Sequence, residues 1–234
     1  MSSHDSILFA APSCTQPNER AAFRFCHNGP VQSVDDIRAI LESYAPRELP
    51  RSEAVKIAAV AAIAHGSSDG VSFLFIHRAE DPRDPWSGHM AFPGGRADDR
   101  DADAHAAAVR ETREEVSLDL DADGRYLGRL SDVAAVGRGR PLSLIIEPYV
   151  FSVEERPVLV PNHEVAEIVW VPLDFLLDRS NRSTMSWRHG EVSVQLPCYH
   201  FRGHVIWGLT FGMVDEIVTL LEGGSGGGRW MDPR

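Results

Sequence analysis

Residues 92–116 read FPGGRADDRDADAHAAAVRETREEV, a glycine-containing loop followed by a stretch of strongly helical composition. We expect a helix over residues 104–116, because alanine, glutamate and arginine dominate there. On such a helix Glu111, Glu114 and Glu115 are three and four positions apart, so their carboxylates lie on or near one face. Like charges at this spacing repel, and the cluster therefore adds no stability to a bare helix.

A hard divalent cation reverses the sign of this interaction between carboxylates. Mg²⁺ prefers oxygen ligands and keeps water molecules and substrate phosphates in its coordination shell. Such an ion neutralises charge on phosphate oxygens and activates a water molecule for attack. The competing interpretation is a solvated helix face, whose surface salt bridges are worth under about 1 kcal/mol. The spacing of the glutamates alone leaves both interpretations open.

Neighbouring residues refine the geometry expected of this helix. Arg110 precedes Glu114 by four positions, so a salt bridge between them would brace that carboxylate. Gly94 and Gly95 allow the backbone to approach a ligand closely and to turn sharply before the helix. The side predicted to pack inward carries Val109, Thr112 and Val116.

The composition is that of an acidic globular protein. The 234 residues carry a formal net charge of -11, and 43% of them are hydrophobic. Such a chain lacks the broad basic surface that binds nucleic acids and anionic membranes, so neither is expected as a partner. Three scattered cysteines without a CxxC pair argue against a zinc site or a disulfide framework. They fit a cytoplasmic location, and no apolar run approaches the roughly 20 residues that a membrane span requires.

The chain is predicted to hold a single domain over residues 31–222. Residues 1–30 have no clear hydrophobic period and are expected to form an irregular arm. Residues 223–234 are glycine-rich and are expected to form a flexible tail.

Signals for strands and for a few helices succeed one another within that domain. Ser33 is the expected N-cap of a first helix, and residues 65–70 have the turn composition of a β-hairpin. Residues 78–103 are predicted to be loop-like. The other expected elements are strands at 54–64, 71–76, 127–130, 142–153, 166–171, 192–195 and 198–201, a short helix at 173–177 and a closing helix at 209–221. This mixture predicts an α/β or α+β fold.

The stretch from Gly95 to Leu118 resembles the Nudix box, in which a glycine precedes Arg-Glu-x-x-Glu-Glu at a set distance. The resemblance implies a Nudix α/β/α sandwich, with a mixed β-sheet between helices. It also implies hydrolysis of the pyrophosphate of a nucleoside diphosphate derivative, a small-molecule substrate. The metal, Mg²⁺ or Mn²⁺, would be held by Glu111, Glu114 and Glu115.

Flanking residues resemble the coenzyme A pyrophosphatase branch of that family. The similar stretches are residues 74–79 with Arg83, residues 88–95, residues 162–173 and residues 206–210. They imply coenzyme A or an acyl coenzyme A as the substrate, contacted by Arg78, Arg83, Gly94 and Gly95. The implied catalytic residues are Glu111, Glu115 and Glu164, and either Glu115 or Glu164 takes the proton from water.

Three features depart from the family patterns. Ser117 stands where the box has glycine, at a position that favours the left-handed conformation and costs a serine about 1 kcal/mol. Asp101 stands near the place of the early glutamate of the box. The spacing from Arg83 to Gly88 is one residue longer than in the coenzyme A branch.

Other functions compete with this assignment. Within enzymes, the alternatives are ADP-ribose, dinucleotides or oxidised nucleoside triphosphates as substrates. A non-catalytic nucleotide sensor is the alternative of another class, but such a domain should have lost one of the three glutamates. The acidic balance disfavours a nucleic-acid processor such as a decapping enzyme. A homodimer is one assembly that the resemblance allows.

Overall fold

The computed structural model describes residues 33–137, 140–189 and 192–224. The predicted irregular arm at residues 1–30 lies outside the described residues, as does most of the predicted tail at 223–234. The single domain over residues 31–222 stays a prediction.

A mixed eight-stranded sheet forms the centre of the protein. Its main path runs β3-β2-β1-β7-β5, with β4 pairing to β1, β6 to β7 and β8 to β2. The strands are β1 Lys56–Ser67, β2 Gly70–Arg78, β3 Met90–Ala91, β4 Gly94–Arg96, β5 Gly124–Arg129, β6 Val133–Gly137, β7 Arg140–Val153 and β8 Val165–Pro172. β1 and β7 are parallel, whereas the other pairings are antiparallel.

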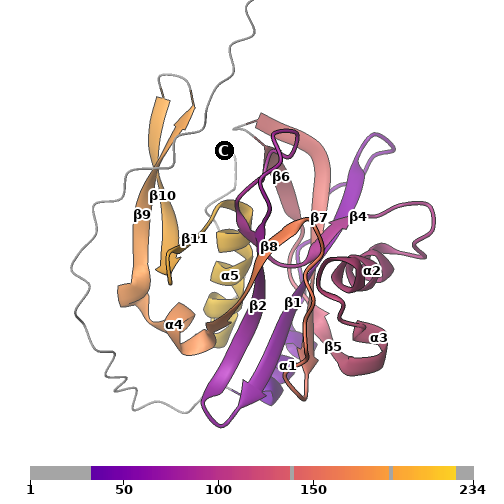
Figure 1. Ribbon diagram of the computed structural model, residues 1–234, viewed down its shortest axis with the longest axis vertical. Coiled ribbons are helices and arrows are strands. Elements are labelled where there is room, and N and C mark those ends of the chain that lie inside the picture. Colours follow the sequence, from indigo (N-terminus) through magenta and orange to yellow (C-terminus); the bar gives the residue numbers. More distant parts are fainter. Residues whose placement is uncertain (1–32, 138–139, 190–191, 225–234) are drawn as a thin grey trace, which may run out of the picture.

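Helices cover both faces of this sheet, which confirms the predicted α/β/α sandwich (Figure 1). One face packs on α2 Ala104–Val116 and the short α3 Leu120–Asp123, and the other packs on α1 Val34–Ser43, α4 Leu173–Leu177 and α5 Gly208–Leu221. Strand β1 is buried on both sides, because Ala59, Ala61 and Ile63 face α2 while Ala62 and Ala64 face the opposite core. A nearly continuous apolar sequence is typical of such a strand.

Several local predictions are confirmed. The hairpin pairs Ile63 with Leu74 and closes where Ser67 pairs with Gly70. Ser33 caps α1 through a capping box, in which its hydroxyl accepts from the Asp36 amide at 3.1 Å. The predicted helices at residues 104–116, 173–177 and 209–221 correspond to α2, α4 and α5.

The C-terminal strands differ from the prediction. Residues 192–195 and 198–201 belong to one strand, β10 Val192–Phe201, rather than to two. It lies between β9 Arg182–His189 and β11 His204–Trp207 in a separate three-stranded sheet. Pro197 lacks an amide hydrogen but does not interrupt β10. The strand β11 pairs with Cys198–Phe201, so β10 has a neighbour on one side alone at Pro197.

The predicted loop at residues 78–103 contains two short strands. β3 pairs with β2, and β4 pairs with β1 so that Ala59 lies opposite Gly95. Strands of two and three residues are too short for a period to be recognised, which explains why the sequence did not reveal them.

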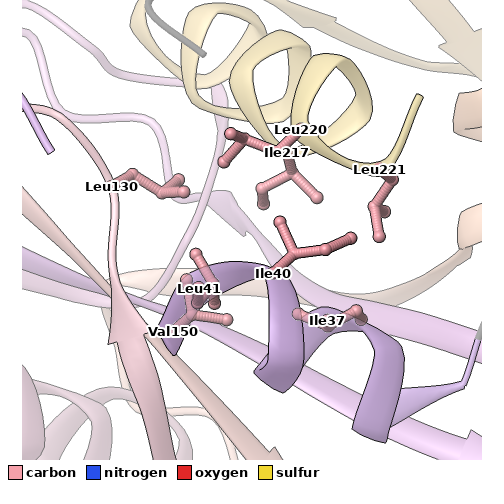
Figure 2. A pocket seen from close by; sticks show the side chains of 8 residues that line it. All are labelled: Ile37, Ile40, Leu41, Leu130, Val150, Ile217, Leu220 and Leu221. Atoms are coloured by element: carbon pink, nitrogen blue, oxygen red, sulfur yellow. The ribbon is translucent and has the colours of Figure 1, made fainter. Parts of the chain in front are cut away.

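An apolar crevice separates α1 from α5 on the face away from α2 (Figure 2). Figure 2 shows the aliphatic side chains that line it, which are Ile37, Ile40, Leu41, Leu130, Val150, Ile217, Leu220 and Leu221. Because none of the described side chains that line it is charged or polar, the crevice offers nothing to bind a nucleotide with, and we regard it as part of the packing between helices.

Ser117 adopts the left-handed conformation expected of it, with φ 60 and ψ 29. Its hydroxyl donates to the Val160 carbonyl at 3.1 Å, a bond that glycine and alanine lack. We expect Ser117→Gly to be more stable than Ser117→Ala by about 1 kcal/mol, because only glycine relieves the strain. Urea unfolding of the two variants measures this difference directly, and equal midpoints would contradict it.

Candidate active site

The site is built where the C-terminal half of α2 faces strand β4. Asp103 caps the start of α2, and the predicted inward side is buried at Val109, Thr112 and Val116. The three glutamates experience different environments. Glu115 is only 2% exposed, the Glu111 side chain is about four-fifths buried and that of Glu114 is about half exposed.

Glu115 is held by the backbone of the glycine loop. Its Oε2 accepts from the Gly94 amide at 2.8 Å, and its Oε1 lies 3.5 Å from Nη1 of Arg78. Burial raises the pKa of Glu115 to about 8, against the opposing effects of the Gly94 amide and Arg78. The charges of Glu111 and Glu164 also contribute to this raised pKa. The protein therefore holds a carboxylate in a position that is unfavourable for its charge.

Neighbouring atoms lie so close to Gly94 and Gly95 that neither position has room for a side chain. Gly94 has a φ of 151, and a Cβ atom there would lie 2.2 Å from the Ala59 carbonyl oxygen of β1. A Cβ atom at Gly95 would lie 2.5 Å from the carboxylate of Glu111. These distances are well below van der Waals contact, so side chains at either position would displace what they meet.

Gly95→Ala is expected to move the Glu111 carboxylate and to lower diphosphate hydrolysis at least about tenfold, since small misplacements of catalytic groups are costly. Stability should change little, because the side-chain end of Glu111 can rotate away. Steady-state kinetics and thermal unfolding of the variant measure the two effects. Unchanged kinetics would show that the position of Glu111 is not important.

Arg110 braces the carboxylates, as the spacing predicted. Its Nη1 donates to Glu111 Oε1 at 2.9 Å and to Glu114 Oε2 at 3.2 Å. Its Nε donates to Oδ1 of Asp101 and its Nη2 donates to Oδ2, both at 2.9 Å. Arg110 lowers the pKa of Asp101 through these bonds. Asp101 thus anchors the arginine that orients Glu111 and Glu114.

A strap formed by residues 156–164 closes the C-terminal end of α2. The Val160 amide donates to the Val116 carbonyl at 3.1 Å, and the Asn162 amide donates to the Glu115 carbonyl at 2.9 Å. At the end of the strap, the Glu164 carbonyl accepts from the Ala79 amide at 2.8 Å. The Glu164 side chain is about half exposed, and its charge reaches Glu111 and Glu115, whose pKa values it raises.

The predicted site residues are therefore brought together to different degrees. Gly94 and Arg78 contact Glu115, and Gly95 borders Glu111. By contrast, Arg83 is 90% exposed, and its guanidinium pairs with Asp81. The sequence did not single out Asp84, which binds Arg78 through both Nε and Nη2. No motif marks an aspartate six residues after an arginine, so only the loop geometry reveals this contact.

The carboxylate oxygens of Glu111, Glu114 and Glu115 are ligands of the type that a hard cation prefers. The charge of Glu111 raises the pKa of Glu115, and a cation between the two carboxylates would relieve this repulsion. Within the described ranges, however, no three carboxylate, histidine or cysteine side chains converge at metal-binding geometry. Glu111 and Glu114 each place one carboxylate oxygen on Arg110, so the arginine engages one oxygen of each side chain.

Comparison with known proteins relates this site to a family. The model of the NUDIX domain matches residues 55–195. Human mitochondrial coenzyme A diphosphatase NUDT8 is 32% identical over 142 residues, which cover 59% of this chain and 58% of that protein. An uncharacterized Nudix hydrolase NudL from Photorhabdus laumondii is 30% identical over 137 residues, covering 58% of this chain and 70% of its own.

The match to the first of these relatives is partial, since this chain spans little more than half of the human protein's length. Among solved structures, a MutT/nudix family protein from Enterococcus faecalis aligns with a TM-score of 0.46 at 17% identity, covering 81% of this chain and 73% of that one. Among the described helices, none is long and apolar enough to cross a membrane.

The family model covers more than half of the chain. The matched region includes the glycine loop, all of α2 and the strap. This chain therefore belongs to the Nudix hydrolase family.

Proposed function

We propose that this chain hydrolyses the diphosphate linkage of coenzyme A or an acyl coenzyme A. One observation carries the hydrolytic part of the proposal, namely the buried Glu115 carboxylate held by the Gly94 amide and facing Glu111 and Glu164. The name of the human relative, a coenzyme A diphosphatase, supports the substrate. The products would be adenosine 3',5'-bisphosphate and a phosphopantetheine fragment.

Each residue of the site has a chemical task in this proposal. Glu111, Glu114 and Glu115 would hold Mg²⁺ or Mn²⁺, which when bound supplies charge neutralisation at the phosphate oxygens and a more acidic water. Glu115 or Glu164 accepts the proton of the attacking water. Arg78 offers N–H donors to the diphosphate, and the bare backbone at Gly94 and Gly95 leaves room for it.

The acid set also weighs against a nucleotide sensor. A buried carboxylate is costly to maintain, and a domain that only binds an anionic nucleotide would gain nothing from placing Glu115 beside it. ADP-ribose, dinucleotides and oxidised nucleoside triphosphates remain the alternative substrates of the same chemistry. A cytoplasmic location and a homodimer stay predictions.

A substrate panel tests the proposal. Coenzyme A, acetyl coenzyme A, ADP-ribose, diadenosine tetraphosphate and oxidised dGTP would be incubated with Mg²⁺ and with Mn²⁺, and the phosphate-containing products identified. Metal-dependent cleavage of coenzyme A is the expected result. Cleavage of another panel member, but not of coenzyme A, would support diphosphate hydrolysis and rule out coenzyme A as the substrate. Tight nucleotide binding without turnover would favour the sensor.

A further inference from the structure

Residues 79–89, which join β2 to β3, contain an aspartate whose contacts the proposed mechanism does not use. We propose that Asp84 is a positioning residue, which fixes the guanidinium of Arg78 so that one edge faces Glu115 and the substrate diphosphate. This inference rests on the proposed function, because the site it serves is the same.

The contact between Asp84 and Arg78 determines the orientation of the guanidinium plane. Oδ2 of Asp84 accepts from Nε of Arg78 at 2.9 Å and lies 2.8 Å from Nη2 in an ion pair. Nη1 is left on the opposite edge, 3.5 Å from Oε1 of Glu115. Both partners are about four-fifths buried, so water competes weakly with the pair.

Asp84 is itself held in place by the loop. Its Oδ1 accepts from the Trp86 amide at 2.9 Å, and its own amide donates to the Asp81 carbonyl at 3.0 Å. The indole of Trp86 donates to the Val136 carbonyl at 3.1 Å, which attaches the loop to strand β6. Trp86 also packs on Ala58, Ala135, Leu144 and Ile146. The position of the Asp84 carboxylate is therefore set by the fold.

The arrangement protects the function of Glu115. An arginine beside a buried carboxylate favours a two-bond pair with it, and such a pair would occupy both Glu115 oxygens. Asp84 engages Nε and Nη2 instead, so Arg78 approaches Glu115 through Nη1, at 3.5 Å, and leaves Oε2 to the Gly94 amide. Arg78 thereby contributes positive charge to the site without blocking the carboxylate that the reaction requires.

A second arginine in the loop shows what the same pairing does without a site beside it. Arg83 binds Asp81 through Nε and Nη2, but its side chain is exposed to solvent. An exposed ion pair of this kind contributes little to the stability of the protein. The functional difference between the two pairs is that only Arg78 also reaches a buried glutamate.

A double-mutant cycle tests whether Asp84 acts through Arg78. The variants are Asp84→Asn, Arg78→Ala and both together. Glu222→Gln is the matched control, because Glu222 binds Arg179 through the same Nε and Nη2 edge at the end of α5, away from the carboxylates. We expect Asp84→Asn to raise KM for coenzyme A about tenfold while kcat changes less than about threefold, as for a contact made equally in ground and transition states. In the Arg78→Ala background the same change should be below about twofold.

A spectroscopic measurement tests the inference without relying on substrate turnover. In the parent protein, the Nε–Hε signal of Arg78 should be visible and slow to exchange in ¹⁵N spectra, and it should be lost or shifted in Asp84→Asn. An unchanged signal, or equal kinetic effects of Asp84→Asn in both backgrounds, would overturn the inference. If the parent hydrolyses no substrate, the proposed function fails, and the Arg78 signal alone still decides the role of Asp84.

Discussion

Glu115→Gln is expected to lower kcat/KM for diphosphate hydrolysis by about a thousandfold, within the range that general-base catalysis contributes. Glutamine has nearly the shape of glutamate, and its amide oxygen can still accept from the Gly94 amide. It can neither take a proton from water nor contribute a negative charge to a cation. The loss therefore reports on the chemistry of the carboxylate and not on its packing.

Stability separates this interpretation from misfolding. Glu115 is buried and its ion pair with Arg78 is long, at 3.5 Å, so removing its charge should leave the thermal midpoint of the metal-free protein unchanged or higher. Glu164→Gln is the informative comparison, because Glu164 is the other candidate base. A larger kinetic loss for Glu164→Gln than for Glu115→Gln would assign proton abstraction to Glu164 instead.

Gly94→Ala should destabilise the protein by about 3–5 kcal/mol and abolish hydrolysis. The new Cβ atom would lie 2.2 Å from the Ala59 carbonyl oxygen and 2.6 Å from the Val60 Cα atom, both in the backbone of β1. Neither atom can move without separating β4 from β1, and the bond from the Gly94 amide to Glu115 would be lost with that pairing. The effect should exceed that of Gly95→Ala, which meets only a side chain.

Gly203→Ala is the control for this prediction. Gly203 also has a positive φ, of 87, but a Cβ atom there would meet nothing within 4 Å. That variant should lose only about 1 kcal/mol, the cost of the backbone conformation. Chemical denaturation of both variants distinguishes a steric clash from conformational strain, and similar losses for the two would contradict the clash.

Local signals explain which elements the sequence predicted correctly. The capping box at Ser33, the turn before Gly70 and the glutamate spacing in α2 each act over a few residues. Strands β6, β9 and β11 were not predicted, although each pairs with a strand next to it in the chain. β9 has a largely polar sequence, and β6 and β11 have only five and four residues, so none of them shows a clear apolar period.

The same distinction applies to the candidate site. The helical spacing predicted that Arg110 would brace Glu114, and it predicted the inward side of α2. It did not predict that Glu115 would be deeply buried, because this burial depends on β4 and the strap. The contact of Asp84 with Arg78 was equally hidden, since it depends on the path of residues 79–89.

The way the strap is attached determines which substitutions it can accept. It is joined to α2 by the amides of Val160 and Asn162, and to residue 79 by the carbonyl of Glu164. Backbone N–H and C=O groups are the same in almost every amino acid, so these hydrogen bonds do not depend on which side chains stand at these positions. The exposed side chains of Val158 and Val160 are thus free to vary during evolution, whereas proline at 160 or 162 would remove a donor and loosen the C-terminal end of α2.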